Sequence, residues 1–270
     1  MDAPDSTEFE RRHARWAELQ RDFGPIRSFS YAWRLPDLAR RAGGDARFRA
    51  ALALAQTLVA MGRHGEALAA LPSATETPPP ALAASLVYCR ACALAATDVQ
   101  SARACFSAAL PHWPERLVAL AATAHFAFVC DTPDPDAGDA YLAAAREAGD
   151  EEHLAHAHLL AEWSRPDSVE PAAIHKGIAW LRLHHPADAA EAEALHAEAR
   201  FRAAPADALV WLDQALALGE KYGRHQFKAR LLKRKAQALE AAGQLADARR
   251  FFEYAEKTAN TQEISSGFDL

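Results

Sequence analysis

Residues 232–255 read LKRKAQALEAAGQLADARRFFEYA, and this stretch decides the fold class. Its apolar residues recur three and four positions apart on both sides of Gly243. That spacing places them on one face of a helix, whereas a strand would alternate apolar and polar residues every second position. Because glycine commonly follows the last turn of a helix, the stretch predicts two helices joined by a short turn.

The composition favours helices along the whole chain. Alanine supplies 66 of the 270 residues, and it has the highest helix propensity and is depleted in strands. Charged residues make up 24%, with a formal net charge of −6, which is typical of an ordinary soluble protein and disfavours a nucleic-acid binder. The length suits one large domain or two small ones.

A three-residue pattern repeats through the chain, in which a small residue is followed by a bulky apolar residue four positions later and alanine three positions after that. It occurs at Ala67/Leu71/Ala74, Ala102/Phe106/Ala109, Ala137/Tyr141/Ala144, Ala208/Leu212/Ala215 and Ala248/Phe252/Ala255. The first three anchors are 35 residues apart, and the wider gap before Ala208 leaves room for another unit with Ile174, Ile178 and Leu181 as its apolar stripe. The spacing between the last two anchors, Ala208 and Ala248, is longer than 35 residues and predicts an insertion around residues 219–224.

Each pattern is predicted to lie on the second helix of a pair, since repeats of this length are typical of stacked helical pairs. The first helices are expected at 45–61, 81–95, 115–130, 151–164, 186–203 and 226–242. Gly62 and Gly243 come just after two of these helices, where a glycine cap is expected.

These units resemble the tetratricopeptide repeat (TPR) family. The best matches are residues 54–74 and 232–255, and residues 102–114 end on the family's closing proline. Arg90 stands where the family has a small residue and Lys235 where it usually has leucine, so the repeats are degenerate. Over residues 45–258 the resemblance implies an all-α, right-handed superhelical solenoid of about six antiparallel helix pairs. A generic helical bundle is the alternative.

Residues 1–44 and 259–270 are interpreted as flanking segments. Residues 6–21 predict a separate N-terminal helix capped by Ser6 or Thr7. The aromatic residues that follow are expected to cap the open end of the stack or, alternatively, to form an exposed partner surface: Phe23, Phe29, Tyr31 and Trp33. Residues 261–270 have no helical pattern and are expected to be frayed.

Two clusters could suggest metal or redox chemistry, and both are interpreted as structural. The pair Cys89 and Cys92 lies in an alanine-rich helix, whereas zinc needs four ligands and redox pairs need a strand-to-helix context. With Cys105 and Cys130 they are interpreted as free thiols. His153, His156 and His158 lie near several glutamates, but the spacing of a zinc-protease helix is absent. We therefore expect no metal and no other cofactor.

Enzyme, membrane and secretory signals are also missing from the sequence. It contains no nucleophile elbow, no phosphate-binding loop and no dinucleotide fingerprint, so we assign no catalytic residue. No apolar run approaches the roughly 18–20 residues of a membrane-spanning helix. The first residues lack the basic and apolar regions of a secretory signal. A non-enzymatic, cytoplasmic protein is expected.

Charge is distributed unevenly along the chain. Residues 131–170 hold eleven acids and two bases, whereas residues 221–250 hold nine bases and two acids. A positive end and a negative middle would orient charged partners and accelerate their association. Two solvated faces of opposite charge are the alternative.

The TPR resemblance implies a protein- or peptide-binding adaptor, because in that family the first helices line a concave groove. Carried over residue by residue, it implies a lining of Arg49, Leu52, Gln56, Val87, Tyr88, Thr123, Phe126, His158, Arg230, Lys233, Arg234 and Gln237. The last four share one helical face, and the cations among them predict a partner with an acidic segment. The carboxylate clamp of some chaperone-binding members is incomplete, because Leu52, Ala53 and Gln56 occupy its early positions.

Two other classes of function stay open. A scaffold or regulatory subunit would use the convex face or the ends of the solenoid inside a larger assembly. An RNA-binding protein or an enzyme without a recognisable signature is a third hypothesis, although the acidic middle disfavours a nucleic acid along the whole groove.

Overall fold

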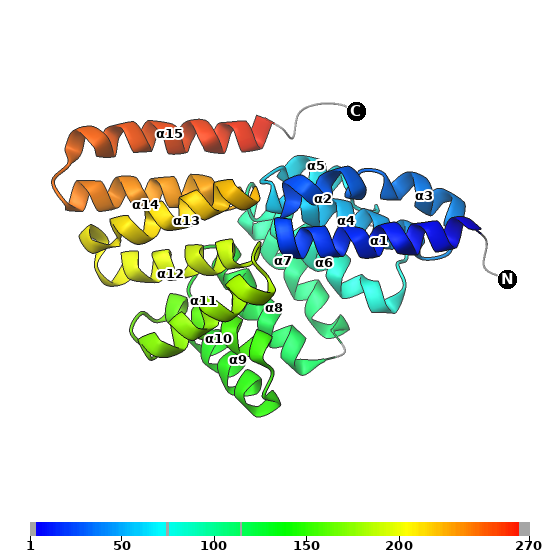
Figure 1. The fold of residues 1–270 in the computed structure, drawn as a ribbon, viewed down its shortest axis with the longest axis horizontal. Helices are drawn as coiled ribbons and strands as arrows, with labels where there is room; N and C mark the ends of the chain where they lie inside the picture. Colours follow the sequence, from blue (N-terminus) through cyan, green and yellow to red (C-terminus); the bar gives the residue numbers. More distant parts are fainter. Residues whose placement is uncertain (1–3, 74–75, 114, 265–270) are drawn as a thin grey trace. The chain divides into compact units, whose positions relative to one another are not determined.

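The computed structural model describes residues 4–73, 76–113 and 115–264, and these residues form helices and loops without a β-strand among them (Figure 1). The chain divides into two compact units. Of the described residues, unit 1 comprises 4–73, 76–113 and 262–264, and unit 2 comprises 115–261. An all-helical fold is thereby confirmed.

Unit 1 contains seven α-helices in its described residues. They are α1 (Pro4–Phe23), α2 (Pro25–Ala32), α3 (Leu35–Ala42), α4 (Ala46–Ala60), α5 (His64–Ala70), α6 (Pro80–Leu94) and α7 (Val99–Ala109), followed by a 3₁₀ turn at Leu110–His112. The core of the unit includes Phe9, Leu35 and Leu58, which are fully buried. Trp16 of α1 donates to the Thr57 hydroxyl of α4 at 2.9 Å, so α1 belongs to this core and not to a separate flank.

Unit 2 contains the remaining helices, except for the last three residues of α15, which are assigned to unit 1. They are α8 (Arg116–Val129), α9 (Pro135–Ala148), α10 (Glu151–Ser164), α11 (Pro171–His184), α12 (Ala189–Ala203), a 3₁₀ turn (Pro205–Ala208), α13 (Leu209–Tyr222), α14 (Lys228–Ala241) and α15 (Leu245–Ile264). Helix α12 is buried almost all round, including the carboxylates of Glu193 and Glu198. A helix buried on every side lies at the centre of its unit.

The predicted first helices correspond to α4, α6, α8, α10, α12 and α14, with ends that differ by three residues at most. The repeated pattern also marks buried positions, because Ala102, Ala109, Ala208, Leu212 and Ala215 are all buried. In α9, Ala145 is buried in place of the half-buried Ala144. Ala74 and Pro114, two further positions of the predicted pattern, lie outside the described residues.

Two residues that depart from the TPR pattern have specific contacts. Arg90 donates to the backbone oxygen of Pro72. Lys235 pairs with Asp213 at 2.5 Å, and its ammonium lies 4.0 Å from the centre of the Phe251 ring. A long cationic side chain at each position is therefore accommodated by a partner instead of being packed as an apolar residue.

The ends of three first helices share one geometry. Gly62, Asp131 and Gly243 follow α4, α8 and α14 with positive φ values of 75°, 51° and 76°. The next amide of each donates back into the helix, as Thr132 does to Ala127 at 2.9 Å. This is the Schellman cap, and glycine is the usual residue for it because a Cβ disfavours positive φ. Asp131 is therefore the unusual member.

The N-terminal region differs from its prediction in two ways. Helix α1 begins at Pro4, so Ser6 and Thr7 lie inside the helix and the predicted cap is wrong. The aromatic segment runs from the end of α1 through α2 to the loop before α3. Phe29 and Tyr31 pack against the core, whereas Phe23 and Trp33 are exposed and do not cap it. Residues 25–32 form a helix that begins at Pro25, because proline is suited to a first helical turn.

The C-terminal half shows two smaller differences. The first of the residues expected as an insertion form the last turn of α13, which ends at Tyr222 with Gly223 in the left-handed conformation. Helix α15 continues to Ile264, beyond the expected start of the tail, and residues 265–270 lie outside the described residues. Within the described part of the chain, no helix combines the length and the apolar character needed to cross a membrane.

Candidate functional site

A cleft of about 390 Å³ lies between α14 and α15 of unit 2. Its lining combines cations, acids and apolar side chains: Asp131, Ala229, Arg230, Lys233, Arg234, Phe252, Ala255, Glu256 and Ala259. The three cations come from one face of α14, because offsets of three and four residues bring side chains together on a helix. The opposite face of α14 buries Leu232, Ala236 and Leu239, which fixes the cationic face toward the cleft.

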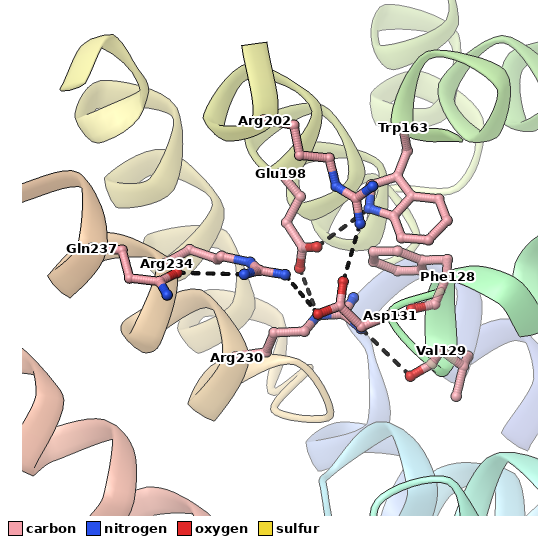
Figure 2. A network of polar contacts seen from close by, with 9 residues as sticks. All are labelled: Phe128, Val129, Asp131, Trp163, Glu198, Arg202, Arg230, Arg234 and Gln237. Atoms are coloured by element: carbon pink, nitrogen blue, oxygen red, sulfur yellow. Dashed lines mark hydrogen bonds and ion pairs between the residues drawn. The ribbon is translucent and has the colours of Figure 1, made fainter. Parts of the chain in front are cut away.

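Arg230 is the best-anchored cation of the cleft (Figure 2). Its Nε donates to Glu198 at 2.6 Å and its Nη1 donates to the backbone oxygen of Phe128 at 2.7 Å. The guanidinium also lies 4.4 Å from the centre of the Phe128 ring and 4.9 Å from that of Phe227. These contacts join α14 to α8 and α12, so Arg230 holds the interior of unit 2 together.

Glu198 is the buried partner of Arg230. Its side chain lies on α12 with 0% of the residue exposed, and it accepts a second hydrogen bond from the indole nitrogen of Trp163 at 3.3 Å. A buried carboxylate is tolerated only when a cation and hydrogen bonds compensate for its lost hydration. The burial of the Glu198 carboxylate therefore depends on the charge and the hydrogen bond that Arg230 supplies.

Asp131 sits between two arginines from different helices. Arg234 of α14 donates to one carboxylate oxygen at 2.6 Å, and Arg202 of α12 donates to the other at 3.2 Å (Figure 2). Burial lowers the pKa of Arg202, while the Asp131 carboxylate raises it again in part. The left-handed backbone of Asp131 points its carboxylate at these cations, which a glycine there could not provide.

Lys233 differs from its two arginine neighbours because its side chain is exposed. Within residues 4–73, 76–113 and 115–264 it forms no ion pair of the kind that anchors Arg230 and Arg234. Lys233 is therefore the cation of the cleft that an incoming group can reach first. Gln237, one turn further along α14, accepts from Arg234 at 3.4 Å.

This geometry corrects one expectation about the cationic face. A cationic face that lines a groove implies that Arg230 and Arg234 could be reversed in charge with the fold intact. Both side chains are largely buried against Glu198 and Asp131, so two new carboxylates there would face two existing ones. Buried like charges are strongly unfavourable, and we expect such a double variant to unfold unit 2.

The other predicted groove residues of unit 2 lie away from the cleft lining. Phe126 is 6% exposed and belongs to the core. Thr123 donates to the backbone oxygen of Ala119 at 2.8 Å. His158 is half-buried on α10, where burial and then Arg146 and Lys176 lower its pKa.

In unit 1 the predicted groove residues occupy two different settings. Arg49 of α4 donates to Glu10 of α1 at 2.9 Å, so α1 contacts the face of α4 that was expected to line a groove. Leu52 is half-buried and Gln56 is exposed on that helix. On α6, Val87 accepts from the Cys105 thiol at 3.4 Å, and the ring centre of Tyr88 lies 5.4 Å from that of Trp113.

Sequence reasoning missed Asp131, Glu198 and Arg202. A signal existed for Asp131, because it stands just after a first helix where two other units have Gly62 and Gly243. Glu198 gave no comparable signal, since an acid in an alanine-rich helix is usually on a solvated face. Their side chains, with Phe128 and Trp163, fill the inner face shared by α8, α10, α12 and α14.

The cysteine and histidine clusters have structural contacts. Cys89 and Cys92 are buried free thiols on α6, and burial raises the pKa of Cys89 to about 12. His153 shares a hydrogen bond of 2.8 Å with the Tyr141 hydroxyl. Among the residues that the structure describes, no group of three or more histidine, cysteine, aspartate or glutamate side chains is arranged to hold a metal ion.

Comparison with known proteins gives no further guide to family or activity: no family model, no curated protein and no solved structure matches the chain. The resemblance to TPR repeats therefore stays a prediction from the residues that carry it. Function has to be argued from the chemistry of the cleft.

Proposed function

We propose that the protein is a non-enzymatic, TPR-like helical-repeat adaptor that binds an acidic, partly apolar segment of a partner protein in the cleft between α14 and α15. The observation that carries the proposal is the cleft lining, which pairs the exposed Lys233 with the apolar Phe252, Ala255 and Ala259. The matching helix positions and the buried alanine anchors support the repeat architecture of about six antiparallel pairs.

The cations of the cleft suit carboxylates in particular. Forked arginine groups bind carboxylates bidentately, while lysine acts as a point charge that tolerates several geometries. Arg234 already holds the Asp131 carboxylate at 2.6 Å, so a carboxylate fits the site chemically. Lys233, one residue before it, is available to a second carboxylate from outside, and Phe252 offers apolar contact beside it.

Selection from a random dodecapeptide library tests the proposal without assuming a partner. The full chain should enrich peptides that combine Asp or Glu with apolar residues, since Lys233 attracts acids and Phe252 and Ala259 of α15 favour apolar side chains beside Glu256. Lys233→Glu should lose this enrichment. Lys176→Glu is the matched control, because it makes the same charge change on the exposed surface of α11 in the same unit.

Circular dichroism should show that both variants keep the wild-type unfolding midpoint, because surface substitutions usually change stability by less than about 0.5 kcal/mol. Acidic enrichment that survives in Lys233→Glu, or that disappears equally in Lys176→Glu, would remove the cleft from the binding mechanism.

A scaffold that uses outer surfaces is the second candidate, and one observation favours it. The inner face of unit 2 is filled by its own side chains, with the ring centres of Phe128 and Phe227 4.6 Å apart. A partner could not enter there without displacing them. Persistent binding of a partner after Lys233→Glu would support this candidate over the cleft.

A further inference from the structure

Helix α2 of unit 1 buries small side chains fully and leaves its large apolar side chains half-buried or exposed. Ser28 and Ala32 are fully buried, whereas Ile26 is 55% exposed. Small residues let a helix approach its neighbours closely, and α2 packs beside α1 and α4. Phe29 and Tyr31 pack against the core with part of their rings, and Ile26 is the large side chain of α2 that is mainly exposed.

The exposed side chains form one continuous outer face on and beside α2. Phe23 is 44% exposed and Trp33 is 48% exposed, and Phe29 is half-buried between them with its ring centre 5.7 Å from that of Trp33. Ile26, Phe29 and Trp33 occur at helical offsets of three and seven residues, so they follow one face. Exposed single apolar residues are ordinary, but a contiguous aromatic face marks an interaction surface.

Two exposed cations, Arg27 and Arg34, border this face. Arg27 lies over the Phe23 ring at 5.1 Å from its centre. Arg63, in contrast, lies over the Phe29 ring at 5.1 Å but is paired with Glu66. Arg34 is exposed at the end of the segment. Between Asp22 and Asp37 the sequence contains no acidic residue. The apolar face is therefore bordered by positive charge.

We propose that the outer face of α2, formed by Phe23, Ile26, Phe29 and Trp33, docks an amphipathic helix of a partner protein whose apolar stripe is flanked by acidic residues. Two helices meet best when apolar anchors spaced by about one turn interlock, and acids beside them would pair with Arg27 and Arg34. This surface is separate from the cleft of unit 2 and would be a second interaction site.

Charge complementarity distinguishes this occupant from two others. A second copy of the chain would bring its own Arg27 and Arg34 against these arginines, and like charges across a symmetric interface are unfavourable. A membrane surface would be entered by side chains that protrude beyond the helix. Here the aromatic rings are about half-covered, two of them beneath guanidinium groups, which gives a flatter surface suited to a packed helix.

The test uses the full chain and a library of alanine-based helical peptides of about 20 residues, a length at which isolated helices form. Randomised positions should be enriched in apolar residues along one face and in Asp or Glu beside it. Affinity for the enriched peptides should fall about tenfold or more in Ile26→Glu and in Arg27→Glu. Val210→Glu and Arg103→Glu are the matched controls at exposed positions of α13 and α7, and neither should change the affinity.

Four outcomes would overturn the proposal. One is enrichment of basic or uncharged flanks, and another is an equal loss of affinity in the control variants. A concentration-dependent dimer in sedimentation experiments that Ile26→Glu abolishes would assign the face to a second copy. Binding to vesicles of phosphatidylcholine and phosphatidylserine that Ile26→Glu abolishes would assign it to a membrane. Lys233→Glu should leave binding of the helical peptides unchanged. Dodecapeptides, in turn, are too short to form a stable isolated helix, so the selection that tests the cleft does not report on the α2 face.

Discussion

Replacing Arg230 by methionine should destabilise unit 2 strongly. Methionine keeps an unbranched apolar stem beside Phe128 and Phe227 but removes the guanidinium that binds Glu198 at 2.6 Å. Glu198 is 0% exposed, and it would keep only the 3.3 Å hydrogen bond from Trp163 among the contacts described above. Removing one partner of a buried ion pair costs about 3–5 kcal/mol. For a domain of about 150 residues this corresponds to a fall in Tm on the order of 10 °C.

Thermal and urea unfolding, followed by far-ultraviolet circular dichroism and tryptophan fluorescence, would measure the effect. Arg250→Met is the control, because its pair with Asp247 is exposed and such pairs contribute little. The double variant Arg230→Met with Glu198→Met should recover most of the loss, since neither charge is left buried. An Arg230→Met protein that unfolds within about 2 °C of wild type, less than the shift expected for 1 kcal/mol, would refute the reasoning.

Three further predictions concern stability and reactivity in unit 1. Ala102→Leu should cost about 1–3 kcal/mol by overpacking a position that is 0% exposed, whereas Ala108→Leu on the exposed side of α7 should be neutral in urea unfolding. Burial lowers the pKa of His64 to about 4. Between pH 6.5 and pH 4 only the unfolded chain binds a proton at this residue, so protonation favours unfolding. The free energy of unfolding of wild type should therefore fall by up to about 3 kcal/mol over this range, and His64→Leu should not show this fall, as measured by urea midpoints across pH. Cys89 should resist iodoacetamide in the native state and react after unfolding, because burial raises its pKa to about 12; rapid native alkylation found by mass spectrometry would contradict this.

Helix positions could be predicted well because their signals are local. The spacing of Ala208, Leu212 and Ala215 depends only on the helical period, and all three are buried as expected. The glycine caps at Gly62 and Gly243 likewise follow from the conformational freedom of one residue. Such features need no knowledge of distant parts of the chain.

The accessibility of the cationic face could not be predicted in the same way. Arg230 meets Glu198 and the Phe128 carbonyl, which are 32 and 102 residues away in the sequence. A row of cations on a helix suggests a solvated surface until the helix that packs against it is known. Only Lys233 keeps the exposed character that the sequence suggested for all three cations.

The outer face of α2 shows a different limit. Its aromatic residues predict either a cap on the open end of the stack or an exposed partner surface, and the sequence does not decide between the two, although large apolar side chains usually form the core. In the structure, Ser28 and Ala32 of α2 are fully buried. Their burial depends on how closely α1 and α4 approach this helix. Helical periodicity identifies two faces of α2, but the packing of its neighbours decides which face is buried.

A charge exchange across the cleft would test the central claim most directly. The affinity of one selected acidic peptide, and of the same peptide with its acids changed to lysine, would be measured by fluorescence anisotropy against wild type and Lys233→Glu. The account predicts that Lys233→Glu weakens the acidic peptide about tenfold or more and strengthens the lysine peptide, because only a direct contact restores affinity when both charges are exchanged. Equal affinities of wild type and Lys233→Glu for both peptides would contradict it.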